Sequence, residues 1–169
     1  MQVSKSLIAL VSVFAATVVT TDASANKKKT PSAAAIAFAQ ETSDLMTNTV
    51  VAALLQEIGE TTPDNVKQGN LSIGLIFDDA NLNMRLVGEL DPLRDNDYPR
   101  DDFEEDALAK AMAGMAATSV EKVSGKWYYR RSIPLSNFAP QCALCHDNFV
   151  GLADTEYVGA LMLRIPIAK

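Results

Sequence analysis

The sequence predicts one mixed helix-and-strand domain of the α+β class. A helical repeat of apolar residues ends near residue 59, and shorter segments with the alternation typical of strands follow it. The chain has 169 residues, of which 48% are apolar and 21% charged. This length suits one ordinary domain, and this composition supports a packed core rather than a disordered chain.

Charge and rare residues exclude several classes of function. The formal net charge is -6 and the isoelectric point is near 4.7, which argues against nucleic acid as a partner because phosphate binding needs a basic surface. The chain has two cysteines and one histidine. These counts exclude a scaffold of several disulfides and a metal site built only from several Cys and His side chains.

Residues 1–25 have the pattern of a secretory signal peptide. A positively charged start with Lys5 precedes an apolar run over residues 7–19, and Ala23-Ser24-Ala25 has the small-x-small form of a cleavage site. A membrane anchor is the alternative, but the run is shorter than the roughly 20 residues that span a bilayer. We expect cleavage after Ala25 and a mature periplasmic chain of residues 26–169, without a membrane span.

The first mature element is predicted to be a long helix. Thr30 suits an N-cap and Pro31 the first helical position, and the pattern continues to about Gly59. Apolar residues recur at spacings of three and four and form one stripe, which we expect to face the core. Its members are Leu45, Met46, Val50, Val51, Leu54, Leu55 and Ile58.

The middle of the chain is predicted to hold two strands and a second helix. Residues 71–77 alternate as a strand, residues 84–90 form a weaker one, and residues 91–100 read as a loop. Asp101 and Asp102 then cap a helix that continues to about Ala117, with an acidic first turn that suits the helix dipole. Its expected buried side contains Phe103, Leu108, Met112 and Met115.

Two more strands are predicted toward the C-terminus. In residues 127–135, alternation places Trp127, Tyr129 and Ile133 on one face and Tyr128 and Arg130 on the other. Residues 136–155 are irregular, and residues 157–167 form the last strand.

The motif that indicates chemistry is Cys142-Ala143-Leu144-Cys145-His146. C-x-x-C-H is the attachment signature of a c-type haem: two thiols add to the haem vinyl groups, and the histidine becomes the proximal iron ligand. Two cysteines at random positions show this spacing, followed by a lone His, on the order of once in ten thousand such chains. The motif therefore predicts one covalent haem c, bound by Cys142 and Cys145, with His146 on the iron.

Three other interpretations of the two cysteines remain open. A thioredoxin-like redox pair would lie at a strand-to-helix turn early in a βαβ unit, whereas this pair lies between two strands and follows Pro140. A disulfide between Cys142 and Cys145 would close a very small loop and contribute little stability. A zinc site would lack a fourth Cys or His ligand.

Several segments together resemble a family of small exported c-type haem proteins with a PAS-like fold. The matching segments are residues 101–104, 128–135, 142–146 and 158–167. The resemblance implies an antiparallel sheet with a long N-terminal helix and the haem held against the sheet, so residues 26–169 form a single domain. Members occur alone or ahead of signalling domains, and we expect this chain to stand alone.

The chain departs from this family at two points. Members often carry a Cys after the first strand that can serve as a second iron ligand, but residues 73–79 contain none. A Gly usually follows the family's motif, where this chain has Asp147.

Methionine is the remaining strong candidate for the sixth iron ligand. His146 is the only histidine, and both thiols are used by the haem. We favour Met84, which follows the first strand, over Met162 on the last strand, and an open sixth position is nearly as well supported. The other methionines of the mature chain are assigned to helix stripes: Met46, Met112 and Met115.

Three side chains and one segment are weaker candidates. Arg130 and Arg131 suit haem propionates, because guanidinium pairs well with carboxylate, or else they belong to a solvated strand face. Trp127 packs on the porphyrin or in the core. The acidic residues between positions 95 and 106 dock a basic redox partner or are simply solvated.

These features predict a periplasmic monohaem protein that carries or senses one electron, with a redox protein as partner. The alternative is a binding module for a small gas such as NO or CO, which requires an open iron position. An enzyme such as a peroxidase would need a distal acid–base group, usually His, and none remains once His146 is used.

Overall fold

The computed structural model describes residues 30–64, 83–90, 97–144 and 146–168. The predicted signal peptide and the predicted strand over residues 71–77 lie outside the described residues. Within them, four antiparallel strands form one sheet in the order β1-β4-β3-β2, which confirms an α+β class with a long N-terminal helix. The elements are α1 (Ala33–Gly59), β1 (Met84–Gly88), α4 (Asp102–Met112), β2 (Ala117–Val123), β3 (Lys126–Ser136), the 3-10 helices η1 (Pro140–Leu144) and η2 (Asp147–Phe149), and β4 (Tyr157–Pro166).

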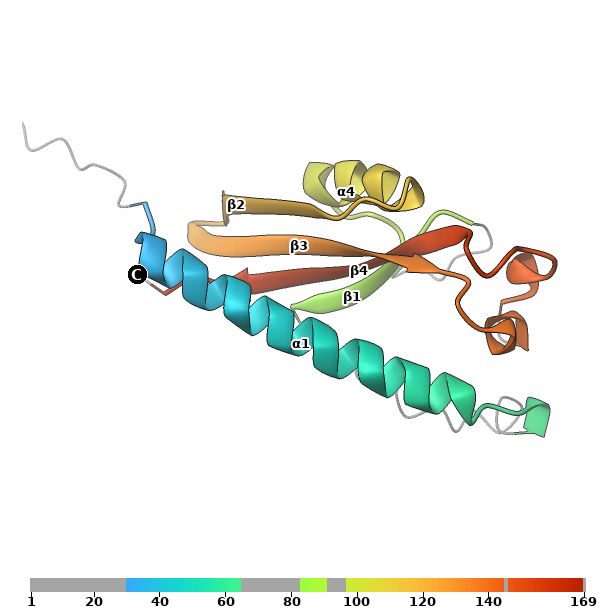
Figure 1. The fold of residues 1–169 in the computed structure, drawn as a ribbon. Helices are drawn as coiled ribbons and strands as arrows, with labels where there is room; N and C mark the ends of the chain where they lie inside the picture. Colours follow the sequence, from blue (N-terminus) through green and yellow to red (C-terminus); the bar gives the residue numbers. More distant parts are fainter. Residues whose placement is uncertain (1–29, 65–82, 91–96, 145, 169) are drawn as a thin grey trace, which may run out of the picture.

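The two helices cover opposite faces of the sheet (Figure 1). Under α1 lie apolar side chains of β1, β3 and β4, while α4 covers a smaller core on the other face. The central strand β4 contributes to both cores, because its side chains alternate between the faces. Leu161, Leu163 and Ile165 face α1, whereas Ala160 and Met162 face α4.

Helix α1 begins two residues later than the sequence predicted. Its N-cap is Ser32, whose extended backbone lets its hydroxyl accept a hydrogen bond from the Ala35 N–H at 3.2 Å. The assignment of Thr30 and Pro31 as the N-cap and first helical residue is therefore wrong. The predicted end at Gly59 is confirmed.

The buried side of α1 is narrower than the predicted stripe. Val50 and Leu54 are buried as expected, but Leu45 and Leu55 are 69% and 53% exposed, so their assignment to the core is wrong. Toward the N-terminus the buried positions are small residues, which allow the helix to approach the sheet closely. They are Ala39, Ser43 and Thr47.

Helix α4 begins as predicted and ends earlier. Asp101 is the N-cap and accepts a hydrogen bond from the Glu104 N–H at 3.1 Å. The predicted continuation to Ala117 is wrong because Gly114, at φ 76°, turns the chain out of the helix. The Met115 N–H closes this turn on Lys110 O at 2.9 Å, a glycine C-cap arrangement. Met115, predicted to be buried, is consequently 54% exposed.

Strand β2 is absent from the prediction, which placed its first residue in the helix. A two-residue turn of Ser124 and Gly125 joins β2 to β3, with φ angles of 48° and 84°. Positive φ at both positions matches the right-handed twist of a hairpin. The turn sets the register in which Val123 pairs with Lys126.

The predicted alternation along β3 is confirmed. Tyr129 is buried in the core beneath α1, with Trp127 and Ile133 packed against that core. Arg130 points to the other face, where it meets residues at the start of α4. No helix in the described part of the chain combines the length and apolarity needed to cross a bilayer.

Candidate functional site

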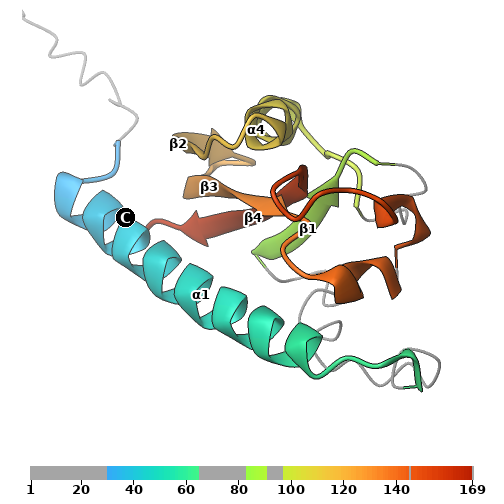
Figure 2. The same cartoon turned by 45° about the vertical axis from the view of Figure 1, so that its right-hand side comes forward.

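The motif segment lies at one end of the sheet, between β3 and β4. Figures 1 and 2 place its two 3-10 helices near the C-terminal end of α1, and η1 contacts α1 directly. Cys142 is half-buried within η1, and His146 is exposed in the link between η1 and η2. Cys145 lies outside the described residues.

A backbone hydrogen bond joins Cys142 to His146. The His146 N–H donates to Cys142 O at 3.0 Å, a bond between residues four apart in the chain. The two residues are therefore held close together at the backbone, although His146 itself, with φ −122° and ψ 88°, lies outside the helical region.

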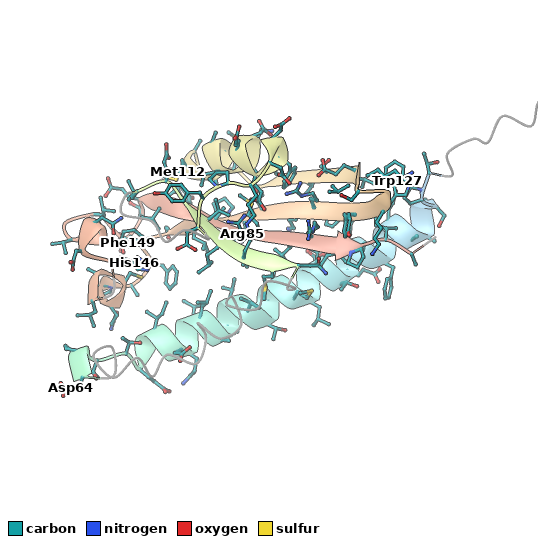
Figure 3. All side chains as sticks on the ribbon, turned by 180° about the vertical axis from the view of Figure 1, so that it is seen from behind. Asp64, Arg85, Met112, Trp127, His146 and Phe149 are labelled. Atoms are coloured by element: carbon teal, nitrogen blue, oxygen red, sulfur yellow. The ribbon has the colours of Figure 1, made fainter. Side chains whose placement is uncertain are left out.

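The imidazole of His146 stacks on the ring of Phe149. Their centroids are 4.7 Å apart and their planes differ by 18° (Figure 3). Leu144, within the motif, and Val150, four residues after it, are 39% and 69% exposed. An exposed imidazole with an aromatic support and an apolar rim fits a flat hydrophobic group such as haem.

Three hydrogen bonds fix the irregular segment that carries the motif. The Asn137 N–H donates to Glu156 O at 2.8 Å, and its side-chain amide donates to Leu152 O at 3.1 Å. The side-chain amide of Asn148 donates to Leu90 O at 2.6 Å. The segment is thus tied to the start of β4 and to the chain after β1, although its sequence shows no regular pattern.

The two methionines considered as iron ligands lie on opposite faces of the sheet. Met84 is 5% exposed in the core beneath α1, the helix that η1 contacts. Met162 is 3% exposed in the core beneath α4. Met84 pairs with Leu163, about 13 Å along the strands from the Gly88–Gly159 pair at the motif end.

Trp127, Arg130 and Arg131 are not brought together at the motif. Trp127 lies at the far end of β3 from His146 and packs against the core beneath α1 (Figure 3). Arg131 faces α1 and forms an ion pair with Asp44. Arg130 faces α4, so the two arginines cannot hold one propionate pair from the same face.

Arg130 belongs to a cluster of charges between α4 and the sheet. Its guanidinium donates to both carboxylate oxygens of Asp101, at 2.7 and 2.9 Å, and to Glu121 at 2.6 Å. Its side chain is only 4% exposed and lies over the Phe103 ring, 4.3 Å from the centroid. Hydrogen bonds to Asp101 and Glu121 outweigh burial and raise the pKa of Arg130.

Glu104 links the other members of this cluster. Its carboxylate accepts hydrogen bonds from Arg85 at 2.6 Å and from the Arg100 N–H at 2.9 Å, and lies 3.5 Å from Arg130. Burial lowers the pKa of Arg85. The negative charge of Glu104 opposes this decrease, and the positive charge of Arg100 adds to it. Burial raises the pKa of Asp101, but hydrogen bonds from Arg130 and the Glu104 N–H lower it by more.

The acidic residues described within positions 95–106 therefore have two different roles. Asp101 and Glu104 are internal partners of arginines, whereas Asp102, Glu105 and Asp106 are exposed. Sequence reasoning missed the buried Glu104. Its position three residues after the N-cap has the spacing of a capping box, but its carboxylate accepts from the N–H of Arg100, the residue before the N-cap, and this spacing does not indicate burial.

No protein-family model matches the chain, and no curated protein matches it significantly. The case for a function consequently depends on the residues and geometry described above.

Proposed function

We propose that this protein is an exported, PAS-like, monohaem c-type protein that carries or senses one electron. The observation that supports it most is the C-x-x-C-H sequence, with His146 exposed and its N–H hydrogen-bonded to Cys142 O. The haem supplies reversible one-electron exchange at its iron when bound. The protein supplies attachment, an axial ligand and the surroundings that set the potential.

Each residue of the motif segment has a defined task in this proposal. The thiols of Cys142 and Cys145 would hold the haem by adding across its two vinyl groups, each S–H supplying the sulfur to one vinyl carbon and the hydrogen to the other. His146 would hold the iron through a ring nitrogen, with the stacked Phe149 ring restricting the rotation of its imidazole. The hydrogen bonds of Asn137 and Asn148 hold the segment at the end of the sheet.

Covalent attachment is tested with the mature chain, residues 26–169, produced together with a c-type maturation system. We expect the purified protein to stay red after acid–acetone extraction and to exceed the chain mass by one haem. Cys142→Ala with Cys145→Ala should abolish both properties. His146→Ala, as the matched control, should change the spectrum of any haem that is still attached. A colourless wild-type protein would contradict the proposal.

For the sixth ligand we propose Met84, because it shares the face of the sheet that α1 covers and η1 adjoins. A Met-ligated iron is low-spin, has a raised potential and resists CO, as suits an electron carrier. Met84→Ala should remove the sulfur-to-iron charge-transfer band. Met162→Ala, on the opposite face, should keep it; loss of the band in this variant instead would assign the ligand to Met162.

Gas binding is the second candidate function. The close packing of Met84 in the core, 5% exposed, favours it, because the side chain must leave that packing to reach an iron near the motif. An open position gives a high-spin ferrous spectrum and rapid CO binding. One absorption series, oxidised and reduced, with and without CO, separates the two functions.

A further inference from the structure

A second polar site lies between the start of α4 and the sheet, separate from the C-x-x-C-H segment. It is a cavity of about 60 Å³ that reaches from β1 across β4 to β3. Arg85, labelled in Figure 3, lies on its β1 side. The charged residues of its lining are Arg85, Arg100, Arg130, Arg164, Asp101 and Glu104.

The lining has an excess of positive charge. Four arginines and two acidic residues line it, and Asp97 acts on Arg85 from outside the lining. Asp101 uses both of its carboxylate oxygens on Arg130, and Glu104 accepts from Arg85 and from the Arg100 N–H. Glu121 pairs with Arg130 from outside the lining. The carboxylates present are thus committed to particular partners.

One buried hydrogen-bond donor in this lining, on Arg130, has no acceptor among the described residues. Arg130 is 4% exposed, and its Nε–H has no hydrogen-bond partner among the residues that the structure describes. A buried charged donor without an acceptor is unfavourable, and a bound oxygen atom relieves it. Arg164 adds a nearby charge, held 5.1 Å from the Tyr128 ring centroid.

Size limits what the cavity accepts. One water needs roughly 10–15 Å³ of cavity volume, so this cavity has room for about four non-hydrogen atoms. Guanidinium groups pair best with a planar pair of oxygens. Acetate, bicarbonate and nitrate have this geometry and this size.

We propose that the cavity binds one small planar anion with a carboxylate-like pair of oxygens. The site is formed by arginines from three strands and from the residue preceding the α4 N-cap. This inference goes beyond the proposed function: none of the cavity's residues lies in the motif segment, although Met84 and Met162, the two candidate iron ligands, also line it.

The test titrates acetate, nitrate and bicarbonate into the mature protein at constant ionic strength, with chloride as the balancing anion. We expect saturable heat in calorimetry and a saturable rise in Tm for at least one of the three. Arg164→Gln should weaken binding about tenfold, since it removes one charge-assisted hydrogen-bonding group. Arg100→Gln, at an exposed residue, should do the same without disturbing the sheet.

The matched control is Lys122→Gln, which removes one positive charge from an exposed position on β2. It should leave the affinity within about twofold of the wild type, as expected for a distant, screened charge. Equal losses in Lys122→Gln and Arg164→Gln, or no saturable binding by any of the three anions, would overturn the proposal.

A haem propionate is another source of the same oxygen pair. Repeating the titration with the Cys142→Ala, Cys145→Ala protein distinguishes the two sources. If the anion binds with equal affinity to the protein with and without covalent haem, the cavity holds a free anion, as proposed. If the anion binds only to the haem-free protein, the proposal is overturned and the cavity is assigned to a haem propionate. Neither result depends on whether the haem carries electrons or binds gas.

Discussion

Arg130 and Arg131 are neighbours in β3, yet the two faces of the sheet hold them differently. Arg130, on the α4 face, is 4% exposed and surrounded by carboxylates, whereas Arg131, on the α1 face, is 25% exposed and pairs with a largely exposed Asp44. The α1 face is otherwise filled by large apolar side chains. Buried ion pairs often stabilise a fold no more than apolar side chains of similar size would. The charges on the α4 face are therefore better explained by a role in positioning the side chains around them than by a gain in stability.

The largest expected effect comes from Glu104, which joins Arg85 and Arg130. Glu104→Ala leaves two buried guanidinium groups without this partner and should lower the free energy of unfolding by about 4 kcal/mol. Urea denaturation followed by circular dichroism measures it. Glu105→Ala, at the exposed neighbouring position, is the control and should change little. Similar losses in the free energy of unfolding for both variants would contradict the placement of Glu104 between Arg85 and Arg130.

On the α1 face, the corresponding change is Leu161→Ala. Leu161 is 0% exposed at the centre of the sheet, so truncation should cost about 3 kcal/mol through lost burial and a cavity. Leu45→Ala removes the same atoms at a position 69% exposed and should cost far less. If the two losses were equal, the core would not lie where the structure places it.

The ion pair of Asp101 should make stability depend on pH. Its pKa is lowered in the folded protein, so its contribution is present above the unfolded pKa and is lost as pH falls through the folded value. Wild-type stability should therefore decrease below about pH 4. Asp101→Asn keeps an N-cap side chain, should cost about 1 kcal/mol at pH 7, and should flatten this decrease. An unchanged slope would show that other carboxyls dominate the acid response.

The smallest effect is expected for the exposed pair on the α1 face. Asp44→Asn should change the free energy of unfolding by less than about 0.5 kcal/mol, because Asp44 is 61% exposed and its pair with Arg131 is screened. The difference should vanish at about 1 M salt. A larger loss in the free energy of unfolding that persists at high salt would show that the ion pair on the α1 face behaves like the buried ion pairs on the α4 face.

Patterns of neighbouring residues in the sequence predicted the elements whose formation depends on those neighbours. Periodicity identified both α-helices and the strands β1, β3 and β4, and the N-cap of α4 at Asp101 was read correctly. Strand β2 was missed because Lys and Glu interrupt its alternation, while the deciding feature is the Ser124–Gly125 turn. The order of strands comes from pairing between distant segments, which no periodicity reveals.

The same division holds for the two candidate sites. The C-x-x-C-H motif was visible in the sequence because its five residues are contiguous in the chain. The arginine cavity was not, because Arg85, Arg100, Arg130 and Arg164 meet only after the sheet has formed. Alternation did predict the separate faces of Tyr129 and Arg130, but not which of them would meet acidic partners.

The position of β4 has a consequence for how the chain folds. Every other helix and strand that the structure describes precedes β4 in the chain, and both hydrophobic cores contain its side chains. The β2–β3 hairpin can form early because its contacts are local, whereas the partner of β1 among the described strands, β4, is synthesised much later. The core beneath α4 cannot close before Met162 has been made, nor the core beneath α1 before Ile167, so both apolar faces of the sheet stay open until the last strand is available.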